Sequence, residues 1–108
     1  MMTTAQVEAR AGTEPRTIDI TVTGEIDLSN VDHVREEIYR VIANDLVLVR
    51  LDLNHVTYLD SSGLRILFAL ADRLHLLQTE LAVIADRGTA ARRIVELAGF
   101  DSVATLKP

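Results

Sequence analysis

Leu46-Val47-Leu48-Val49-Arg50-Leu51-Asp52-Leu53 is the stretch of this sequence that decides the fold. Nearly all of it is aliphatic, which is typical of a central strand covered on both faces. It continues through Asn54–Leu59 into Asp60-Ser61-Ser62-Gly63. Apolar residues then recur at helical spacing, at Leu64, Leu67, Phe68, Ala71 and Leu74. A buried strand followed at once by an amphipathic helix predicts an α/β fold with parallel strands.

The residues before this strand predict a hairpin and a helix. Residues 5–10 form a weak strand, and residues 11–15 form a loop in which Gly12 is available for a positive φ. Residues 17–23 alternate between apolar and polar, which indicates a strand with one solvent-exposed face that ends at Gly24. An acid three residues after Ser29 is typical of a helix start. The next apolar residues share one helical face: Val31, Val34, Ile38, Val41 and Ile42.

The residues after the first buried helix predict two more strands and one more helix. Residues 81–85 (LAVIA) form an aliphatic strand, and Thr89 begins the helix. Gly99 followed by Phe100 is typical of a helix stop, and residues 103–106 form a short last strand. The predicted order is β-β-α-β-α-β-α-β. It implies one α/β domain with an N-terminal β-hairpin and a mixed, largely parallel sheet.

The composition fits one domain over residues 1–108, with a core at about residues 7–106. The chain has 108 residues, 48% of them apolar, and no Cys. The lack of Cys excludes disulfides, thiolate metal sites and a Cys nucleophile, and we expect a reducing, cytoplasmic location. The longest apolar run, Ile66–Ala71, is six residues long. That is too short for a membrane span or a signal peptide, so we expect no membrane insertion.

The charge lies mainly in the first half of the chain. Residues 1–53 carry ten acidic and five basic residues, whereas residues 54–108 carry six of each. Binding to nucleic acid or to an anionic membrane would require a clustered basic face. We therefore expect neither as a partner.

The sequence contains no recognisable catalytic or metal-binding motif. Its glycines are too widely spaced for a dinucleotide fingerprint or a phosphate-binding loop. His33, His55 and His75 are too far apart for a local metal motif, and we expect them to be surface or partly buried residues. Neither Ser61 nor Ser62 lies in a Gly-x-Ser-x-Gly elbow, although His55 could in principle act as a base for Ser61. We expect no catalytic residue, no metal and no cofactor.

Two short runs remain as candidate sites, each with a structural and a functional interpretation. Gly24-Glu25-Ile26-Asp27 either ends a strand with solvated acids or belongs to a surface that docks a basic partner. Asp60-Ser61-Ser62-Gly63 either caps the following helix or presents a hydroxyl for phosphorylation at a helix N-terminus. We expect Gly63 to adopt a conformation that a side chain would strain, or to admit the backbone of a partner.

Taken together, these runs resemble the STAS domain of bacterial anti-sigma factor antagonists. The resemblance extends from about Val7 to Leu106. It is carried by Gly24-Glu25-Ile26-Asp27, by Leu51-Asp52-Leu53 and by Tyr58-Leu59-Asp60-Ser61-Ser62-Gly63-Leu64. It implies a protein that binds an anti-sigma factor serine kinase and thereby frees a sigma factor for transcription.

The resemblance also implies a phosphorylation switch. The family's acceptor is the residue directly after the Asp, here Ser61, with Ser62 as the second candidate. The kinase uses ATP to phosphorylate this serine and so ends binding, and a phosphatase acting on the phosphoserine restores it. The partner-binding residues implied are Glu25, Asp27, Asp60, Ser61, Ser62, Gly63, Leu64 and Arg65.

Two features depart from the family's pattern, and two other functions stay open. Many members have Gly where this chain has Arg65, so the partner-facing edge of the helix differs. Many also have a helix after the last strand, which we expect to be absent here. One alternative is a stand-alone STAS scaffold subunit of a transporter complex, which need not be phosphorylated. The other is a small α/β enzyme or nucleotide binder, which the missing phosphate loop disfavours.

Overall fold

The computed structural model describes residues 4–108 and contains five strands, three α-helices and one turn of 3-10 helix. In chain order the elements are β1 (Ala5–Ala11), β2 (Thr17–Ile26), α1 (Val31–Arg40), β3 (Leu48–Leu59), α2 (Ser61–Leu76), β4 (Glu80–Ile84), α3 (Ala90–Leu97), the 3-10 turn (Phe100–Ser102) and β5 (Thr105–Lys107). The order confirms the predicted β-β-α-β-α-β-α-β arrangement. Residues 1–3 of the expected domain lie outside the described residues.

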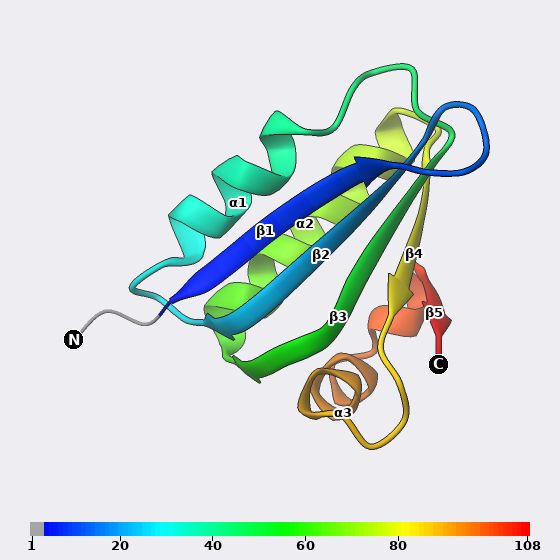
Figure 1. Cartoon of the computed structure of the whole chain (residues 1–108). Coiled ribbons are helices and arrows are strands. Elements are labelled where there is room, and N and C mark those ends of the chain that lie inside the picture. Colours follow the sequence, from blue (N-terminus) through cyan, green and yellow to red (C-terminus); the bar gives the residue numbers. More distant parts are fainter. Residues whose placement is uncertain (1–3) are drawn as a thin grey trace.

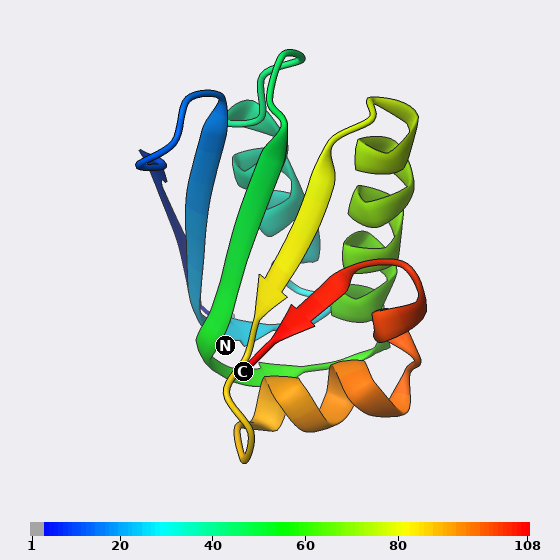
Figure 2. The ribbon, with the colours of Figure 1, turned by 90° about the vertical axis from the view of Figure 1, so that its right-hand side faces the viewer.

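The strands form one mixed sheet in the order β1-β2-β3-β4-β5. β1 pairs with β2 antiparallel, and the remaining neighbours pair parallel, as expected of a hairpin followed by helical crossovers. Figure 1 shows α1 and α2 behind the same face of the sheet. Figure 2 shows the face of the sheet that α1 and α2 do not cover, and α3 lies below the sheet where β3 bends. The carboxyl ends of β2 and β3 therefore meet next to the start of α2.

The core lies between the sheet and the two helices α1 and α2. One side of β2 and β3 is buried along its length, and the facing helix residues are also buried. Phe68 of α2 stacks edge-on against Phe100, with ring centroids 5.0 Å apart. This contact ties the last part of the chain to α2. Among residues 4–108, no helix has the length and hydrophobicity needed to cross a membrane.

The expectation that the central strand is covered on both faces is wrong. Val49 and Leu51 of β3 are buried, but Arg50 and Asp52, which alternate with them on the other face, are only half-buried. The reason is that α1 and α2 lie on one side of the sheet (Figure 2). β3 therefore alternates like a strand of a one-sided sheet.

Two glycine expectations are also corrected. β2 does not end at Gly24 but continues to Ile26, and Gly24 has a φ of +102° where the pairing with β3 shifts register. Such a bulge needs a residue that tolerates positive φ, so this glycine bends the strand rather than ending it. In the hairpin loop the left-handed residue is Arg16 (φ 60°), not Gly12. A Cβ on Gly12 would lie 1.9 Å from Thr17 Oγ1, so close packing requires that glycine.

The predicted ends of α3 are confirmed, whereas the start of α1 differs. Thr89 is the N-cap of α3, and its hydroxyl accepts a hydrogen bond from Arg92 N (3.2 Å). Gly99 follows the helix with a φ of +75°, and Phe100 beyond it is buried. α1 begins at Val31 with Asn30 as its N-cap, one residue after the expected Ser29. The Asn30 side chain is used elsewhere, in the loop described below.

Candidate functional site

The two candidate runs meet at the carboxyl edge of the sheet. β2 and β3 are parallel neighbours, and their register pairs Glu25 with Tyr58 and Ile26 with Leu59. One residue further on, Asp60 N donates a hydrogen bond to Ile26 O (3.3 Å). Figure 1 shows this edge where β2 and β3 end beside the start of α2. The fold thus joins segments that are far apart in the sequence.

Asp60 caps α2 and connects it to the loop after β2. Its Oδ1 accepts hydrogen bonds from Ser62 N (3.0 Å), Gly63 N (3.2 Å) and Ser62 Oγ. The backbone N–H of Leu28, in the loop after β2, also contributes to the low pKa of this side chain. The Ser62 hydroxyl is the largest cause, and the backbone N–H groups a further cause, that hold the pKa of Asp60 below its ordinary value. Asp60 is therefore a carboxylate at neutral pH.

The two serines after Asp60 have different surroundings. Ser62 is half-buried, and its hydroxyl donates to the Asp60 carboxylate. Ser61 is exposed, and within residues 4–108 its hydroxyl makes no hydrogen bond. His55 is exposed on β3, opposite Thr23 of β2, and no hydrogen bond joins it to Ser61 in the described part of the chain. The arrangement presents one free hydroxyl and offers no built-in base for it.

The loop between β2 and α1 is held by its own polar side chains. Buried Asn30 accepts from Asp27 N (3.0 Å) and donates to Glu25 O (2.7 Å). Asp27 Oδ1 accepts from Ser29 N (2.9 Å) and Ser29 Oγ (2.6 Å). Between them, the Leu28 side chain is 79% exposed. Of the expected acids, Glu25 thus lies at the end of β2 and Asp27 on the ordered loop that follows it.

Sequence reasoning missed Asn30 and Leu28. An Asn directly before a helix suggests only an N-cap, and its backbone partner on β2 becomes visible only when the loop is folded. A single leucine between Asp27 and Ser29 carries no periodic signal. Its exposure makes it, with the exposed Tyr58 at the end of β3, one of two large apolar side chains of residues 4–108 that are open to solvent near this edge of the sheet.

Gly63 does not adopt the strained conformation that we expected. It is buried in the first turn of α2, and no positive φ distinguishes it. A Cβ built there would lie 2.3 Å from Leu59 Cδ1 and 3.1 Å from Ile26 Cγ2. The glycine is thus required because α2 packs closely on the ends of β2 and β3. Of its expected neighbours in the site, Leu64 is half-buried against the core and Arg65 is exposed.

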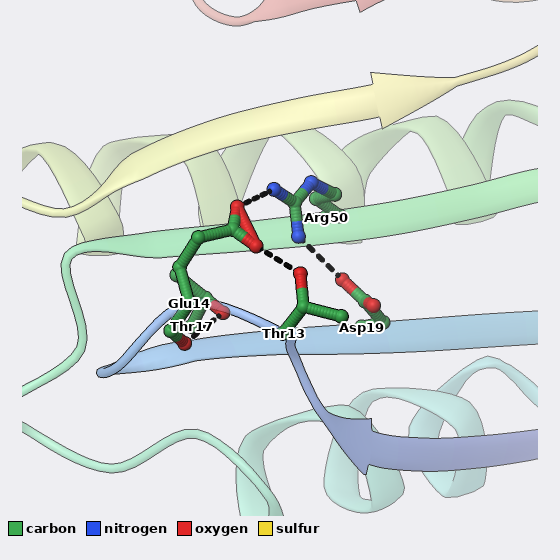
Figure 3. A network of polar contacts seen from close by, with 5 residues as sticks. All are labelled: Thr13, Glu14, Thr17, Asp19 and Arg50. Carbon is green, nitrogen blue, oxygen red and sulfur yellow. Dashed lines mark hydrogen bonds and ion pairs between the residues drawn. The ribbon is translucent and has the colours of Figure 1, made fainter.

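A second polar cluster, which sequence reasoning missed, lies on the open face of the sheet (Figure 3). Arg50 of β3 pairs with Glu14 of the hairpin loop and with Asp19 of β2, the latter at 3.0 Å between Nη1 and Oδ1. The Thr13 hydroxyl also donates to Glu14. The hydrogen bond from Thr13, and then that from Arg50, lower the pKa of Glu14. These hydrogen bonds and ion pairs join the hairpin loop to β2 and β3 near the amino ends of the two strands. The cluster therefore anchors the hairpin loop.

The titratable residues do not gather into a metal centre in the described chain. His33, His55 and His75 are exposed on α1, β3 and α2 respectively. Within residues 4–108, no three His, Asp or Glu side chains are placed to hold one ion.

Comparison with known proteins places this geometry in context. Residues 8–108 match the STAS domain family. An anti-sigma-B factor antagonist of Listeria monocytogenes is 34% identical over 94 residues, which cover 83% of this chain and 78% of that protein. The anti-sigma-F factor antagonist RsfB of Mycobacterium tuberculosis is 34% identical over 82 residues, 76% of this chain and 66% of that protein. The crystal structure of an anti-sigma factor antagonist from Mycobacterium paratuberculosis superposes with a TM-score of 0.83 at 30% identity, covering 97% of this chain and 86% of that one.

Proposed function

Because this chain belongs to the STAS domain family, with anti-sigma factor antagonists among its relatives, we propose that it binds an anti-sigma factor serine kinase and is released when Ser61 is phosphorylated. In the unphosphorylated state it occupies the anti-sigma factor, so that the sigma factor is free for transcription. A phosphatase acting on phosphoserine restores the binding form. The docking surface consists of Glu25, Asp27, Leu28, Asp60, Ser61, Ser62, Leu64 and Arg65; Gly63 supports it from below.

The observation that carries the choice of acceptor is the difference between the two hydroxyls. A kinase needs a hydroxyl oxygen that can approach the γ-phosphorus in line with the leaving group. Ser61 is exposed and free of hydrogen bonds to residues 4–108, whereas the Ser62 hydroxyl is half-buried and bonded to Asp60. Modification of Ser62 would first have to break that bond. This favours Ser61.

The transfer requires groups that the kinase supplies. Ser61 Oγ forms a bond to the γ-phosphorus of ATP while the bond from that phosphorus to the β,γ-bridging oxygen breaks. ADP leaves, and the hydroxyl proton passes to a base of the kinase. In the reverse direction, a phosphatase directs water to the phosphorus while the bond from phosphorus to Ser61 Oγ breaks; inorganic phosphate leaves and Ser61 Oγ regains a proton. No step requires a base from this chain.

Phosphate at Ser61 would end binding by charge and bulk at the docking surface. It adds roughly −1.5 to −2 charges at pH 7 next to the anionic Asp60. A partner shaped for a neutral hydroxyl would have to desolvate that charge, and like-charge contacts in an interface cost several kcal/mol. A penalty of about 3 kcal/mol weakens binding on the order of 100-fold. Because Ser61 is exposed, the fold itself should stay intact.

The test is phosphorylation of the purified chain by its anti-sigma kinase, followed by peptide mass spectrometry and a binding titration. We expect phosphate on Ser61, loss of the signal in Ser61→Ala, and unchanged modification in Ser62→Ala. Exposed Ser102, at the far end of the chain, provides the matched control Ser102→Ala. Omitting the kinase should abolish the signal. Phosphate found only on Ser62 or elsewhere would refute the assignment, and full function of a Ser61→Ala, Ser62→Ala double variant would favour a transporter scaffold.

A further inference from the structure

Arg65 is a cation without an ion-pair partner, one helical turn from the proposed acceptor. Both Ser61 and Arg65 are exposed, and both lie on α2 at positions i and i+4. None of the ion pairs within residues 4–108 involves Arg65. It is also the only Lys or Arg between positions 51 and 72. The positive charge nearest to Ser61 along the chain is therefore uncommitted.

Helix geometry directs Arg65 toward Ser61. Residues four apart are neighbours on a helix surface, with their Cβ atoms about 5 to 6 Å apart. Side chains on a helix lean toward its N-terminus, so the arginine extends back over the first turn. A phosphate on Ser61 Oγ would point outward from that same turn. A guanidinium of that length can reach the phosphate oxygens and pair with two of them.

Most of the usual anion donors of the α2 N-terminus are already engaged. The N–H groups of Ser62 and Gly63 donate to Asp60 Oδ1, and that of Leu64 donates to Asp60 O (3.0 Å). A phosphate on Ser61 thus meets the Asp60 carboxylate, and the N–H of Ser61 is the one amide of this turn without a hydrogen bond within residues 4–108. That single N–H and the helix dipole have to offset the repulsion unless a side-chain cation contributes. Arg65 supplies such a cation.

We propose that Arg65 is the internal counter-ion of phosphorylated Ser61, and that the two side chains form a phosphate–guanidinium pair along the first turn of α2. The inference rests on the proposed function for the modification itself. The pair withdraws the Arg65 charge from the docking surface at the moment when the phosphate appears. Phosphorylation then changes two groups of that surface together, adding a negative charge and engaging the adjacent positive one.

The experiment installs phosphoserine at position 61 during translation, so that no kinase is needed. The second ionisation of the phosphate is followed by ³¹P NMR at low salt in otherwise wild-type protein, in Arg65→Gln, in Arg65→Lys and in the control Arg93→Gln. Arg93 is exposed on α3 and likewise lacks an ion pair within the described chain. Amide spectra of each variant verify the fold. The Nε–H resonance of Arg65 is recorded with and without the phosphate.

We expect Arg65→Gln to raise the second pKa of the phosphate by roughly 0.2 to 0.7 unit, as for an exposed ion pair. Arg65→Lys should give a smaller rise and Arg93→Gln almost none. The difference should shrink at about 1 M salt, and the Arg65 Nε–H signal should shift on phosphorylation. Equal pKa values in all four proteins, or an equal rise in Arg93→Gln, would overturn the pair. Failure of a kinase to modify Ser61 would overturn only the proposed function, because the installed phosphate tests the pair directly.

Discussion

A single carboxylate, that of Asp60, connects the elements of the candidate site. Its side chain accepts hydrogen bonds from the first turn of α2, and its backbone N–H donates to Ile26 O at the end of β2. It also holds the Ser62 hydroxyl. The capping and functional interpretations of this run are therefore compatible, because the cap is what leaves only Ser61 free.

The lowered pKa of Asp60 predicts acid-dependent stability. A carboxyl whose folded pKa lies below its unfolded value, here near 3.8, stabilises the fold above the unfolded value and loses that contribution as pH falls through the folded one. Asp60→Ala, which also removes the cap, should cost about 1 kcal/mol at pH 7. Asp60→Asn keeps a capping side chain but not the charge, so its deficit relative to wild type should shrink as pH falls from neutral to below the unfolded value of 3.8.

Melting curves of the three proteins across that pH range measure the effect. Asp101, which is exposed in the 3-10 turn, provides the control Asp101→Asn. A wild-type minus Asp60→Asn difference that stays constant with pH would contradict the assignment of a depressed pKa to Asp60.

At the scale of elements, α2 packs on the ends of β2 and β3 so closely that Gly63 has no room for a side chain. A Cβ there meets Leu59 Cδ1 at 2.3 Å. Helix propensity alone would make Gly63→Ala stabilising by about 1 kcal/mol. Overpacking of a buried site costs about 1 to 3 kcal/mol, so we expect net destabilisation. The sign of the change, measured by urea denaturation, decides between the two effects.

The exposed Ala69 on the same helix provides the comparison. Ala69→Gly should destabilise by about 1 kcal/mol through propensity alone. If Gly63→Ala proved more stable than wild type while Ala69→Gly behaved as expected, the close contact with Leu59 would not constrain the helix.

At the scale of the whole molecule, the acidic excess of residues 1–53 predicts which charges steer association. Glu25 is exposed near the end of β2, at the same edge of the sheet as the start of α2, whereas Glu80 is also exposed but starts β4 at the opposite end of the strands. Glu25→Gln should slow association with a basic partner by a few-fold at low salt and little at high salt, since exposed charges act chiefly on the association rate. Glu80→Gln should change it less. Stopped-flow association measured over a range of ionic strength tests this, and equal effects of both substitutions would argue against docking at the Ser61 edge.

Local patterns in the sequence predicted the order of the helices and strands, but not how the helices pack against the sheet. The alternation in residues 17–23 and the caps at Asp60 and Thr89 depend on nearby residues, and they were interpreted correctly. The one-sided burial of β3 depends on where distant helices pack, which an aliphatic run does not reveal. The sequence also does not reveal why position 63 must be glycine. The atoms that leave no room for a side chain there belong to Leu59 of β3 and Ile26 of β2.

The candidate site was predictable only as two separate runs. The residues next to Ser61 follow from its position in the chain, and the parallel pairing of β2 with β3 followed from the βαβ pattern. The hydrogen bond from Asp60 N to Ile26 O and the two bonds of the Asn30 side chain depend on loop geometry. Irregular backbone has no periodic signature, so these contacts needed coordinates.

The junction of β2, its following loop and α2 has a consequence for quality control. The junction exists only after two distant segments have come together, since Asp60 N donates a hydrogen bond to Ile26 O at the end of β2. An enzyme that recognises this junction reads a conformational epitope and not a linear peptide. Nascent, proteolysed or heat-damaged copies would not be phosphorylated. The ratio of phosphorylated to unphosphorylated protein would therefore describe only copies that have completed folding.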